Sequence, residues 1–266
     1  MSAYNPPVQP HYPPQQDYPP NFGAPYAGNP GPGMAQQPWN TETYVPPGAR
    51  TILATLAIGS VSVLSFAVDI SQLVFGAELK SDNPGMVAAL ATGLSGIGML
   101  GTMVLSAIFF SLWIHRASKN LRGLNRNGME YSPGWCVGWF YVPFANLFRP
   151  VRAMTELWRA SEPDGEGDRW RMAMGTPMLG AWWGAYIGSN VLSNISARID
   201  DPVTSGTVGF IGSIVMAASA ILCIMLMFGI DKRQEAAAAK LGQNAAAPPP
   251  YMPGGAPPYG GAPFQG

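Results

Sequence analysis

The sequence is poor in charged residues and in residues that bind metals. Asp, Glu, Lys and Arg make up only 11% of the 266 residues, against about 25% in an average soluble domain. Two cysteines cannot build a disulfide framework, and two histidines, His11 and His115, are too few for a histidine-rich metal site. The net charge of zero argues against a nucleic-acid-binding domain, because such a domain carries a basic excess. The sequence therefore predicts no metal site and no nucleic-acid partner.

Glycine and proline, by contrast, are abundant. Residues 1–50 hold 13 of the 27 prolines and two Tyr-Pro-Pro motifs, and residues 241–266 hold seven prolines and no charge. Such segments cannot bury enough apolar surface to offset the entropy of ordering, so both are predicted to be disordered tails with polyproline II character. They could be solvated spacers, or they could recruit cytoplasmic proteins, since polyproline II is a pre-extended ligand.

Four long apolar runs lie between the tails, within residues 51–240. The runs cover about residues 51–75, 86–114, 172–197 and 207–230. Asp69 is the only charged residue inside them. About 20 apolar residues are enough for a helix to cross the hydrocarbon core, and a helix satisfies its own backbone there. The predicted fold class is therefore an all-α integral membrane protein with four transmembrane helices.

The distribution of basic residues predicts the orientation. With four spans, the two tails and the loop after the second span share one side, which holds 13 of the 15 Lys and Arg residues. The other side holds only Lys80 and Arg198. Because cytoplasmic segments carry the excess of Lys and Arg, we expect both termini to lie in the cytoplasm.

An aromatic segment, residues 133–150, separates the second and third runs. Six of its 18 residues are aromatic, and Pro143 interrupts it. A fifth span here would remove the charge asymmetry, so we favour a re-entrant or interfacial segment that dips into the cytoplasmic side of the membrane, where Trp and Tyr rings prefer to lie. Residues 151–160 then repeat apolar side chains at helical spacing. They predict an amphipathic helix on the inner leaflet, where arginines can meet anionic lipid headgroups.

The same region carries a resemblance to a known family. Fixed spacings run in order through Trp113-x-x-Arg116-x-x-x-Asn120-Leu121, Ser132-Pro133-x-Trp135-x-x-Gly138-Trp139-Phe140-x-x-Pro143-x-x-Asn146-Leu147-x-x-Pro150 and Met154-x-Glu156-x-Trp158. This pattern resembles the bacterial membrane family called domain of unknown function 4328, over about residues 50–235. The resemblance implies a bacterial inner-membrane protein, and it supplies no catalytic residues.

Polar residues at the end of the second run form the first candidate site. Arg116 and Asn120 are four residues apart and share a helix face with Trp113 close by. Together with Asn146 and Glu156 they could form a cluster under the aromatic segment, where an arginine–carboxylate pair would hold that segment in place. The cluster could bind an anionic ligand or a lipid headgroup, but we favour a structural role.

Polar residues inside the runs form the second candidate site. Asp69 and Gln72 are three apart in the first run, and Asn190 and Asn194 are four apart in the third. Such residues are costly in lipid and often functional. Asp69 could instead reach interfacial water near the end of its run. The two asparagines could line a polar cavity or bond to another helix, and we favour the bond between helices.

A row of small residues marks the third run. Gly180, Gly184 and Gly188 recur every four residues, and such rows let helices approach closely in lipid. The row could mediate packing inside the four-helix bundle, which we favour, or it could mark a homo-oligomer interface.

These features favour a non-enzymatic membrane anchor or organiser whose tails recruit cytoplasmic partners. A small transporter, channel or lipid-handling protein is the alternative, because broken segments and polar residues at membrane depth often line sites. An intramembrane enzyme is disfavoured. Ser95 lies in a Gly-x-Ser-Gly motif, but His115 is 20 residues further along the same helix, about 30 Å away. The sequence therefore predicts no catalytic residues and no cofactor.

Overall fold

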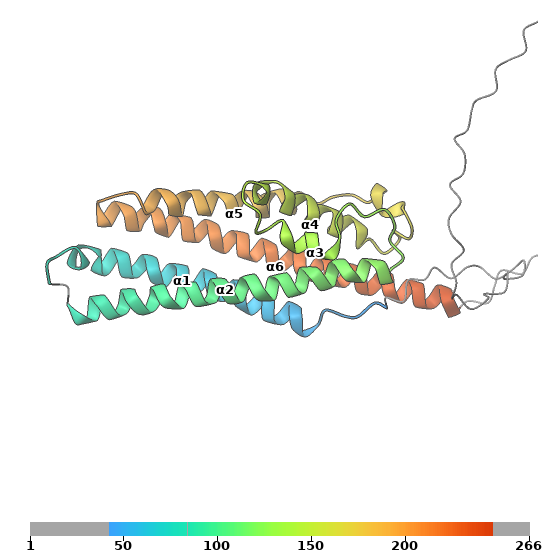
Figure 1. Ribbon diagram of the computed structural model, residues 1–266, viewed down its shortest axis with the longest axis horizontal. Helices are drawn as coiled ribbons and strands as arrows, with labels where there is room; N and C mark the ends of the chain where they lie inside the picture. Colours follow the sequence, from blue (N-terminus) through green and yellow to red (C-terminus); the bar gives the residue numbers. More distant parts are fainter. Residues whose placement is uncertain (1–42, 84, 247–266) are drawn as a thin grey trace, which may run out of the picture. The chain divides into compact units, whose positions relative to one another are not determined.

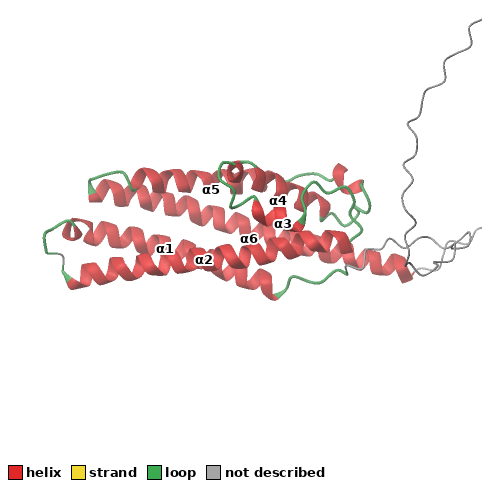
Figure 2. Cartoon of the chain, in the orientation of Figure 1, coloured by secondary structure: helices red, strands yellow, loops and turns green. Residues whose placement is uncertain are grey.

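The computed structural model describes residues 43–83 and 85–246. Most of both predicted tails, residues 1–42 and 247–266, lies outside the described residues. The regular elements of the described residues are all helices (Figure 2). This confirms the predicted all-helical class for this part of the chain. The elements are α1 (Ala49–Leu79), α2 (Met86–Gly123), α3 (Pro133–Gly138), η1 (Ala145–Leu147), α4 (Arg149–Ala160), η2 (Arg169–Met172), α5 (Pro177–Ser196) and α6 (Pro202–Ala246).

Three of these helices are long and apolar enough to cross a membrane. They are α1, α2 and the part of α6 up to Gly242. The predicted third run, residues 172–197, also forms a helix, the 20-residue α5. It is not among the candidate spans, since glycine, serine, asparagine and tryptophan lower its mean hydropathy.

The long helices pack side by side. α1 packs along α2 and α6, and α5 packs along α6 (Figure 1). The α1–α2 connection and the α5–α6 connection lie together, because Lys80 Nζ donates a hydrogen bond to the carbonyl oxygen of Asp200. We call this the turn end of the bundle. The opposite end, where α3 and α4 pack, is called the loop end.

Along its whole length, α1 packs through small residues. Its buried positions are Thr51, Ala54, Ala57, Ser62, Ser65, Ser71 and Gly76. Its large aliphatic side chains point outward instead, and Val63 is 69% exposed. This pattern is the inverse of a water-soluble bundle. It is typical of helices in lipid, where small residues let backbones approach and large apolar residues face hydrocarbon.

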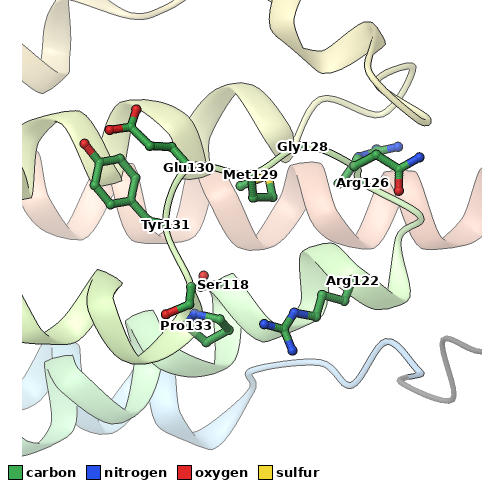
Figure 3. A pocket seen from close by; sticks show the side chains of 10 residues that line it. Ser118, Arg122, Arg126, Gly128, Met129, Glu130, Tyr131 and Pro133 are labelled. Carbon is green, nitrogen blue, oxygen red and sulfur yellow. The ribbon is translucent and has the colours of Figure 1, made fainter. Parts of the chain in front are cut away.

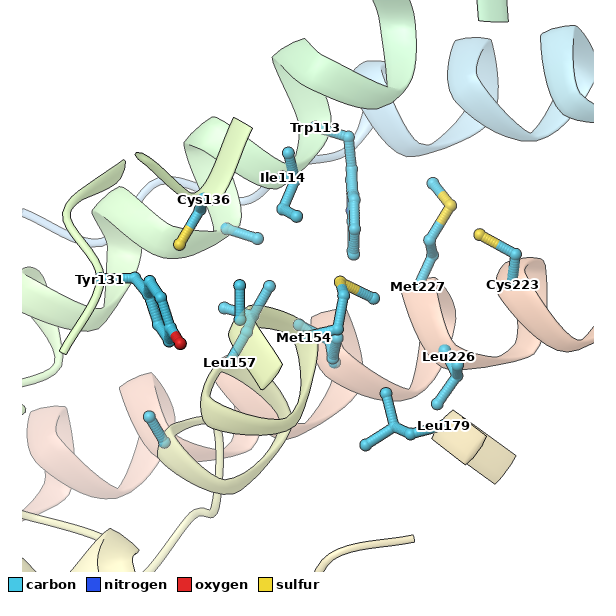
Figure 4. Close-up of a cluster of buried hydrophobic side chains, with 14 of the residues drawn as sticks. Trp113, Ile114, Tyr131, Cys136, Met154, Leu157, Leu179, Cys223, Leu226 and Met227 are labelled. Atoms are coloured by element: carbon cyan, nitrogen blue, oxygen red, sulfur yellow. The ribbon is translucent and has the colours of Figure 1, made fainter. Parts of the chain in front are cut away.

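Large buried side chains gather at the loop end. Trp113 and Ile114 of α2, Met154 and Leu157 of α4, and Met227 of α6 are fully buried and point toward one another (Figure 4). Burying a side chain of this size contributes roughly 1.5–3 kcal/mol each. The loop end therefore has a hydrophobic core like that of a soluble domain.

The helix predicted at residues 151–160 is present as α4, but the environment of its apolar face differs from the prediction. Ala153, Met154, Leu157 and Ala160 are buried in the protein core. This face therefore contacts protein and not a lipid leaflet, and any contact of α4 with lipid has to use its other face.

The aromatic segment is broken into short pieces. Ser132 caps α3, accepting a hydrogen bond from the backbone N–H of Trp135 at 3.4 Å, and Pro133 occupies the first turn. After the turn at Pro143, Phe144 adopts a left-handed backbone with φ of 62°. Neither α3 nor η1 approaches the length of a spanning helix, so these pieces argue against the fifth-span alternative.

Candidate functional site

A polar junction joins three helices at the loop end. The Asp231 carboxylate on α6 accepts a hydrogen bond from Thr51 Oγ1 of α1 at 2.6 Å and one from Trp113 Nε1 of α2 at 3.1 Å. One carboxylate therefore links α1, α2 and α6. Hydrogen bonds to a charged acceptor are stronger than neutral ones, so this link favours a single arrangement of the three helices.

Two buried amides extend the polar junction. Asn120 Nδ2 donates to Gln234 Oε1 at 3.1 Å and to the Val45 carbonyl at 3.0 Å, while its Oδ1 accepts from the Val45 N–H at 3.2 Å. Gln234 Nε2 donates to the Ala117 carbonyl at 2.9 Å and to Ser161 Oγ at 3.1 Å. Both amides thus have partners despite full burial, which avoids the cost of an orphaned polar group. Through Asn120, the segment before α1 is tied to α6.

The five-residue cluster predicted under the aromatic segment does not form one site. Trp113 and Asn120 belong to the polar junction, whereas Glu156 binds the loop before α3. Its carboxylate accepts the backbone N–H groups of Glu130 at 2.8 Å and Tyr131 at 3.1 Å. Burial raises the pKa of Glu156, and these two hydrogen bonds oppose the shift.

Both carboxylate oxygens of Glu156 bind backbone amides, and within residues 43–83 and 85–246 Glu156 forms no ion pair with Arg116, so the predicted arginine–carboxylate pair does not form there. Arg116 keeps a buried Nε without a hydrogen-bond partner. Asn146 is half-buried in the turn, where its backbone N–H donates to the Val142 carbonyl at 2.9 Å.

The residues of α6 that complete the polar junction are not among the predicted site residues. Asp231 directly follows the fourth apolar run, and Gln234 lies three residues further on the same helix face. An acid at the end of a 24-residue apolar run was a usable signal, but its partners on α1 and α2 lie far away in sequence.

A set of charged contacts, which we call the charged clamp, holds the end of α6 against the loop after α4. Arg233 pairs with Glu162 and lies 4.5 Å from the Trp158 ring centroid, and Lys240 Nζ lies 2.5 Å from Asp164 Oδ1. Both pairs are partly exposed, so each contributes modestly to stability. The clamp joins the last part of α6 to the loop after α4.

Buried Arg126 supports the same loop from the other side. Its Nε donates to the Ala160 carbonyl at 2.8 Å, and its Nη2 donates to the Glu162 carbonyl at 2.6 Å. Burial lowers the pKa of Arg126, while the carboxylates of Glu166, Glu162 and Asp164 oppose the shift. Arg126 therefore fixes the end of α4 by satisfying carbonyl groups that would otherwise lack a donor.

A polar pocket of about 500 Å³ lies beside this loop (Figure 3). It is lined by Ser118 and Arg122 of α2 and by residues 126–133. Arg122 and Arg126 bring positive charge to it, and Glu130 brings negative charge. In residues 43–83 and 85–246, no group of three or more His, Cys, Asp or Glu side chains could hold a metal ion.

A second cavity, of about 390 Å³, lies between α1, α2, α5 and α6. We call it the interhelical cavity. Its lining is mainly aliphatic and aromatic, with Phe140 and Tyr141 of the aromatic segment at one side. Asn190 belongs to the lining, but this cavity is mainly apolar and differs from the polar cavity considered for Asn190 and Asn194.

The predicted bond between helices from the two asparagines is wrong. Asn190 Nδ2 donates to the Tyr186 carbonyl at 2.7 Å, and Asn194 Nδ2 donates to the Asn190 carbonyl at 2.8 Å. Both acceptors lie one turn earlier on α5, because a short amide on a helix reaches its own backbone most easily.

Asp69, in contrast, does contact another helix. Its carboxylate accepts a hydrogen bond from Ser213 of α6 and lies against Gly209, where an added Cβ would stand 2.6 Å from Oδ1. Gln72 is exposed. Asp69 therefore helps α1 and α6 to pack near the turn end.

The predicted packing of the glycine row inside the bundle is wrong for two of its three members. A Cβ added at Gly180 or Gly184 would meet no atom within 4 Å, and both residues are exposed. Gly188 only approaches Val215, at 4.0 Å. Another face of α5 makes the close contact with α6, since a Cβ on Gly212 would stand 3.3 Å from Leu192 Cβ and 3.6 Å from Ser193 Oγ.

The chain matches one known family. The model of the family described as Domain of unknown function (DUF4328) matches residues 81–232, which is more than half of the chain, so the chain belongs to this family. The match covers α2 to α5 and α6 as far as residue 232, and it includes Trp113, Asn120 and Asp231 of the polar junction. No curated protein and no solved structure matches the chain.

Proposed function

We propose that this DUF4328 protein is a non-enzymatic anchor or organiser of the bacterial inner membrane. Its four long helices cross the membrane, and its two proline-rich tails recruit partners in the cytoplasm. The loop end is cytoplasmic, because it carries nearly all of the Lys and Arg residues. The tails are the part of the chain that binds partners, and the membrane domain holds them in place.

The contact between the two connections at the turn end supports a fourth span. Lys80, between α1 and α2, bonds to Asp200, between α5 and α6. If α1, α2 and α6 cross the membrane, these two connections emerge on the same side, and α5 has to run the full depth to join them to the loop end. At 20 residues, α5 is about 30 Å long, which matches the hydrocarbon core.

The observation that carries the anchor proposal is the Asn120 contact in the polar junction. Asn120 binds both backbone groups of Val45, and it also binds Gln234 in the last third of α6. Both tails therefore depart from the same end of the bundle. Two short recruiting segments held on one side have a high effective concentration for a shared partner.

Removal of the tails tests the anchor proposal. We expect the full chain to co-purify cytoplasmic proteins that are lost when residues 1–42 and 247–266 are replaced by glycine–serine segments of equal length. A variant in which only the tyrosines of the Tyr-Pro-Pro motifs become alanine separates motif binding from tail length. An unchanged set of co-purified proteins after replacement of both tails would contradict the proposal.

Cysteine labelling tests the topology separately. Both native cysteines are buried, and burial raises the pKa of the Cys136 thiol to about 11, so they should react poorly with a maleimide. Replacing both, as Cys136→Ala and Cys223→Ala, gives a background without native thiols. In it, an impermeant maleimide added outside spheroplasts should label Ser81→Cys and not Asn127→Cys, both exposed positions. The reverse labelling would overturn the proposed orientation, and labelling of both would overturn the span count.

The aromatic segment supplies the interfacial contact in this arrangement. Phe144 is 84% exposed on its left-handed turn, and Trp135 and Phe148 are also exposed. Large exposed aromatic rings at this level suit the headgroup region, where the ring is buried and polar groups stay wet. This segment therefore forms the cytoplasmic rim of the membrane domain.

A further inference from the structure

The interhelical cavity has a buried wall and an exposed mouth. Trp182, Ser219 and Cys223 of α5 and α6 form the wall and are almost fully buried. Tyr141 and Tyr186 line the same cavity and are 56% and 40% exposed. The cavity therefore reaches the surface at the two tyrosines.

Aromatic contacts close the cavity toward the loop end. Phe140 packs against Phe110 of α2 at 5.1 Å between ring centroids and against Trp183 of α5 at 6.1 Å. The Tyr141 hydroxyl is held to α2 as well, 2.7 Å from Ser111 Oγ and 3.2 Å from the Ala107 carbonyl. These contacts bridge α2 and α5, so the mouth faces sideways, between those helices.

The surface around the mouth is apolar. On α2, Met103 lines the cavity and is 52% exposed, and it lies within a candidate membrane span. An exposed apolar side chain at this depth is surrounded by hydrocarbon if α2 crosses the membrane. The molecules that arrive at the mouth are therefore those dissolved in the bilayer.

Three polar side chains of the cavity wall already bond within the protein. Ser219 Oγ donates to the Trp182 carbonyl at 3.2 Å, Ser62 Oγ to the Ile58 carbonyl at 3.5 Å, and Asn190 Nδ2 to the Tyr186 carbonyl at 2.7 Å. A polar solute would find few unpaired donors here, whereas a hydrocarbon chain would lose no hydrogen bonds by entering.

We propose that the interhelical cavity binds one acyl chain of a membrane phospholipid, which enters sideways between α2 and α5. The volume of about 390 Å³ falls in the usual range for ligand pockets, roughly 300–1,000 Å³. It suits a single chain better than a whole two-chain lipid. The ester and headgroup of the lipid stay at the mouth, where the Tyr141 and Tyr186 rings offer amphipathic contacts. This site is independent of the tails and goes beyond the anchor function.

Photocrosslinking with the full chain tests the proposal. The protein is reconstituted in vesicles of phosphatidylethanolamine and phosphatidylglycerol that contain a trace of phosphatidylcholine with a diazirine in one acyl chain. We expect crosslinks on α5 and α6 peptides that contain Trp182, Ser219 or Cys223. These residues are buried, so lipid that only surrounds the protein cannot reach them.

Two neighbouring variants provide the matched comparison. Ser106→Phe fills the cavity, because Ser106 lines it, whereas Leu105→Phe adds a ring to the lipid-facing surface one residue away. Overpacking should lower crosslinking of the wall peptides about tenfold in S106F. L105F should leave it unchanged. Elution volume and thermal midpoint report whether S106F folds, and Ala220→Leu fills the cavity from α6 if it does not.

Three outcomes would overturn the proposal. These are equal crosslinking of the wall in S106F and L105F, crosslinks confined to lipid-facing residues, and labelling of the wall by a free diazirine alkane but not by the phospholipid. The last outcome would point to a different apolar ligand. Because capture of partners by the tails is measured separately, failure of this proposal leaves the anchor proposal standing, and the converse also holds.

Discussion

The two ends of the helix bundle are built by different rules. Toward the turn end, α1 contacts its neighbours through Ser62, Ser65, Ser71 and Gly76, and large aliphatic side chains point outward. At the loop end, Trp113, Met154 and Met227 are fully buried, and amides and a carboxylate are bonded between helices. The difference is explained by the surroundings. In lipid, helices associate through close packing of small residues. Burial of large apolar side chains stabilises a fold where these side chains would otherwise be exposed to water.

The largest expected effect is at the loop end, in Trp113→Ala. This change removes a fully buried ring and the hydrogen bond to Asp231, and it should lower the free energy of unfolding by about 3–5 kcal/mol. Leu112→Ala, one residue away and half exposed, should change it far less. The comparison is measured by unfolding in mixed detergent micelles. Equal losses for the two variants would mean that the loop end is not a core of the soluble kind.

Arg126→Met tests the buried polar groups of the same end. It leaves the Ala160 and Glu162 carbonyls without their donor and should cost about 2 kcal/mol. Arg152→Met is the control, because Arg152 is exposed on α4. If the two variants unfold at the same denaturant concentration, Arg126 does not hold the loop.

Gly209→Ala probes the close approach toward the turn end. A new Cβ would stand 2.6 Å from Asp69 Oδ1 and 3.2 Å from Ser196 Oγ, so the two side chains must shift, at a cost of about 1 kcal/mol. Gly101→Ala is the matched control on α2, where a Cβ meets nothing within 4 Å. The control should be neutral or slightly stabilising, since alanine favours the helix. A larger loss in G101A than in G209A would contradict packing through small residues.

The smallest effect is a pH dependence at the loop end. Burial raises the pKa of Glu156 above its ordinary value of 4.5, so the folded state holds this proton at a pH where the unfolded state has lost it. The cost of burying the charged carboxylate is present at neutral pH, and it is relieved as the pH falls through the folded pKa.

Glu156→Gln isolates this contribution. The stability of the wild type relative to E156Q should rise as the pH is lowered from 7 toward the ordinary pKa of 4.5. Thermal midpoints of both proteins at several pH values provide the measurement, and the other titrating groups cancel in the difference. A relative stability that falls with decreasing pH would show that the hydrogen bonds to Glu130 and Tyr131 outweigh burial.

The sequence predicted helices far better than contacts. Runs of apolar residues predicted all four long helices, and the spacing of Val151, Met154 and Leu157 predicted α4. The prediction failed where the partner of a side chain is far away in sequence or lies in its own backbone. Asn190 and Asn194 bond to their own helix, and Glu156 bonds to backbone amides of a loop.

The polar junction shows the same limit most clearly. Trp113 and Asn120 were candidates because the sequence shows that both lie near the end of the same predicted helix. Their partners, Asp231 and Gln234, lie more than 100 residues away, and no local pattern connects the two pairs. Only the packing of α2 against α6 brings them into contact.

The sequence by itself determined the helical class, the apolar runs, the family and the asymmetry of basic charge, because each of these depends on local composition or periodicity. The tertiary structure alone decided which helix faces meet. It placed Asn120 between Val45 and Gln234, turned Gly180 and Gly184 outward, and left an apolar cavity between four helices. Which faces meet depends on how side chains from distant segments fill a shared space, and spacing along one helix does not contain that information.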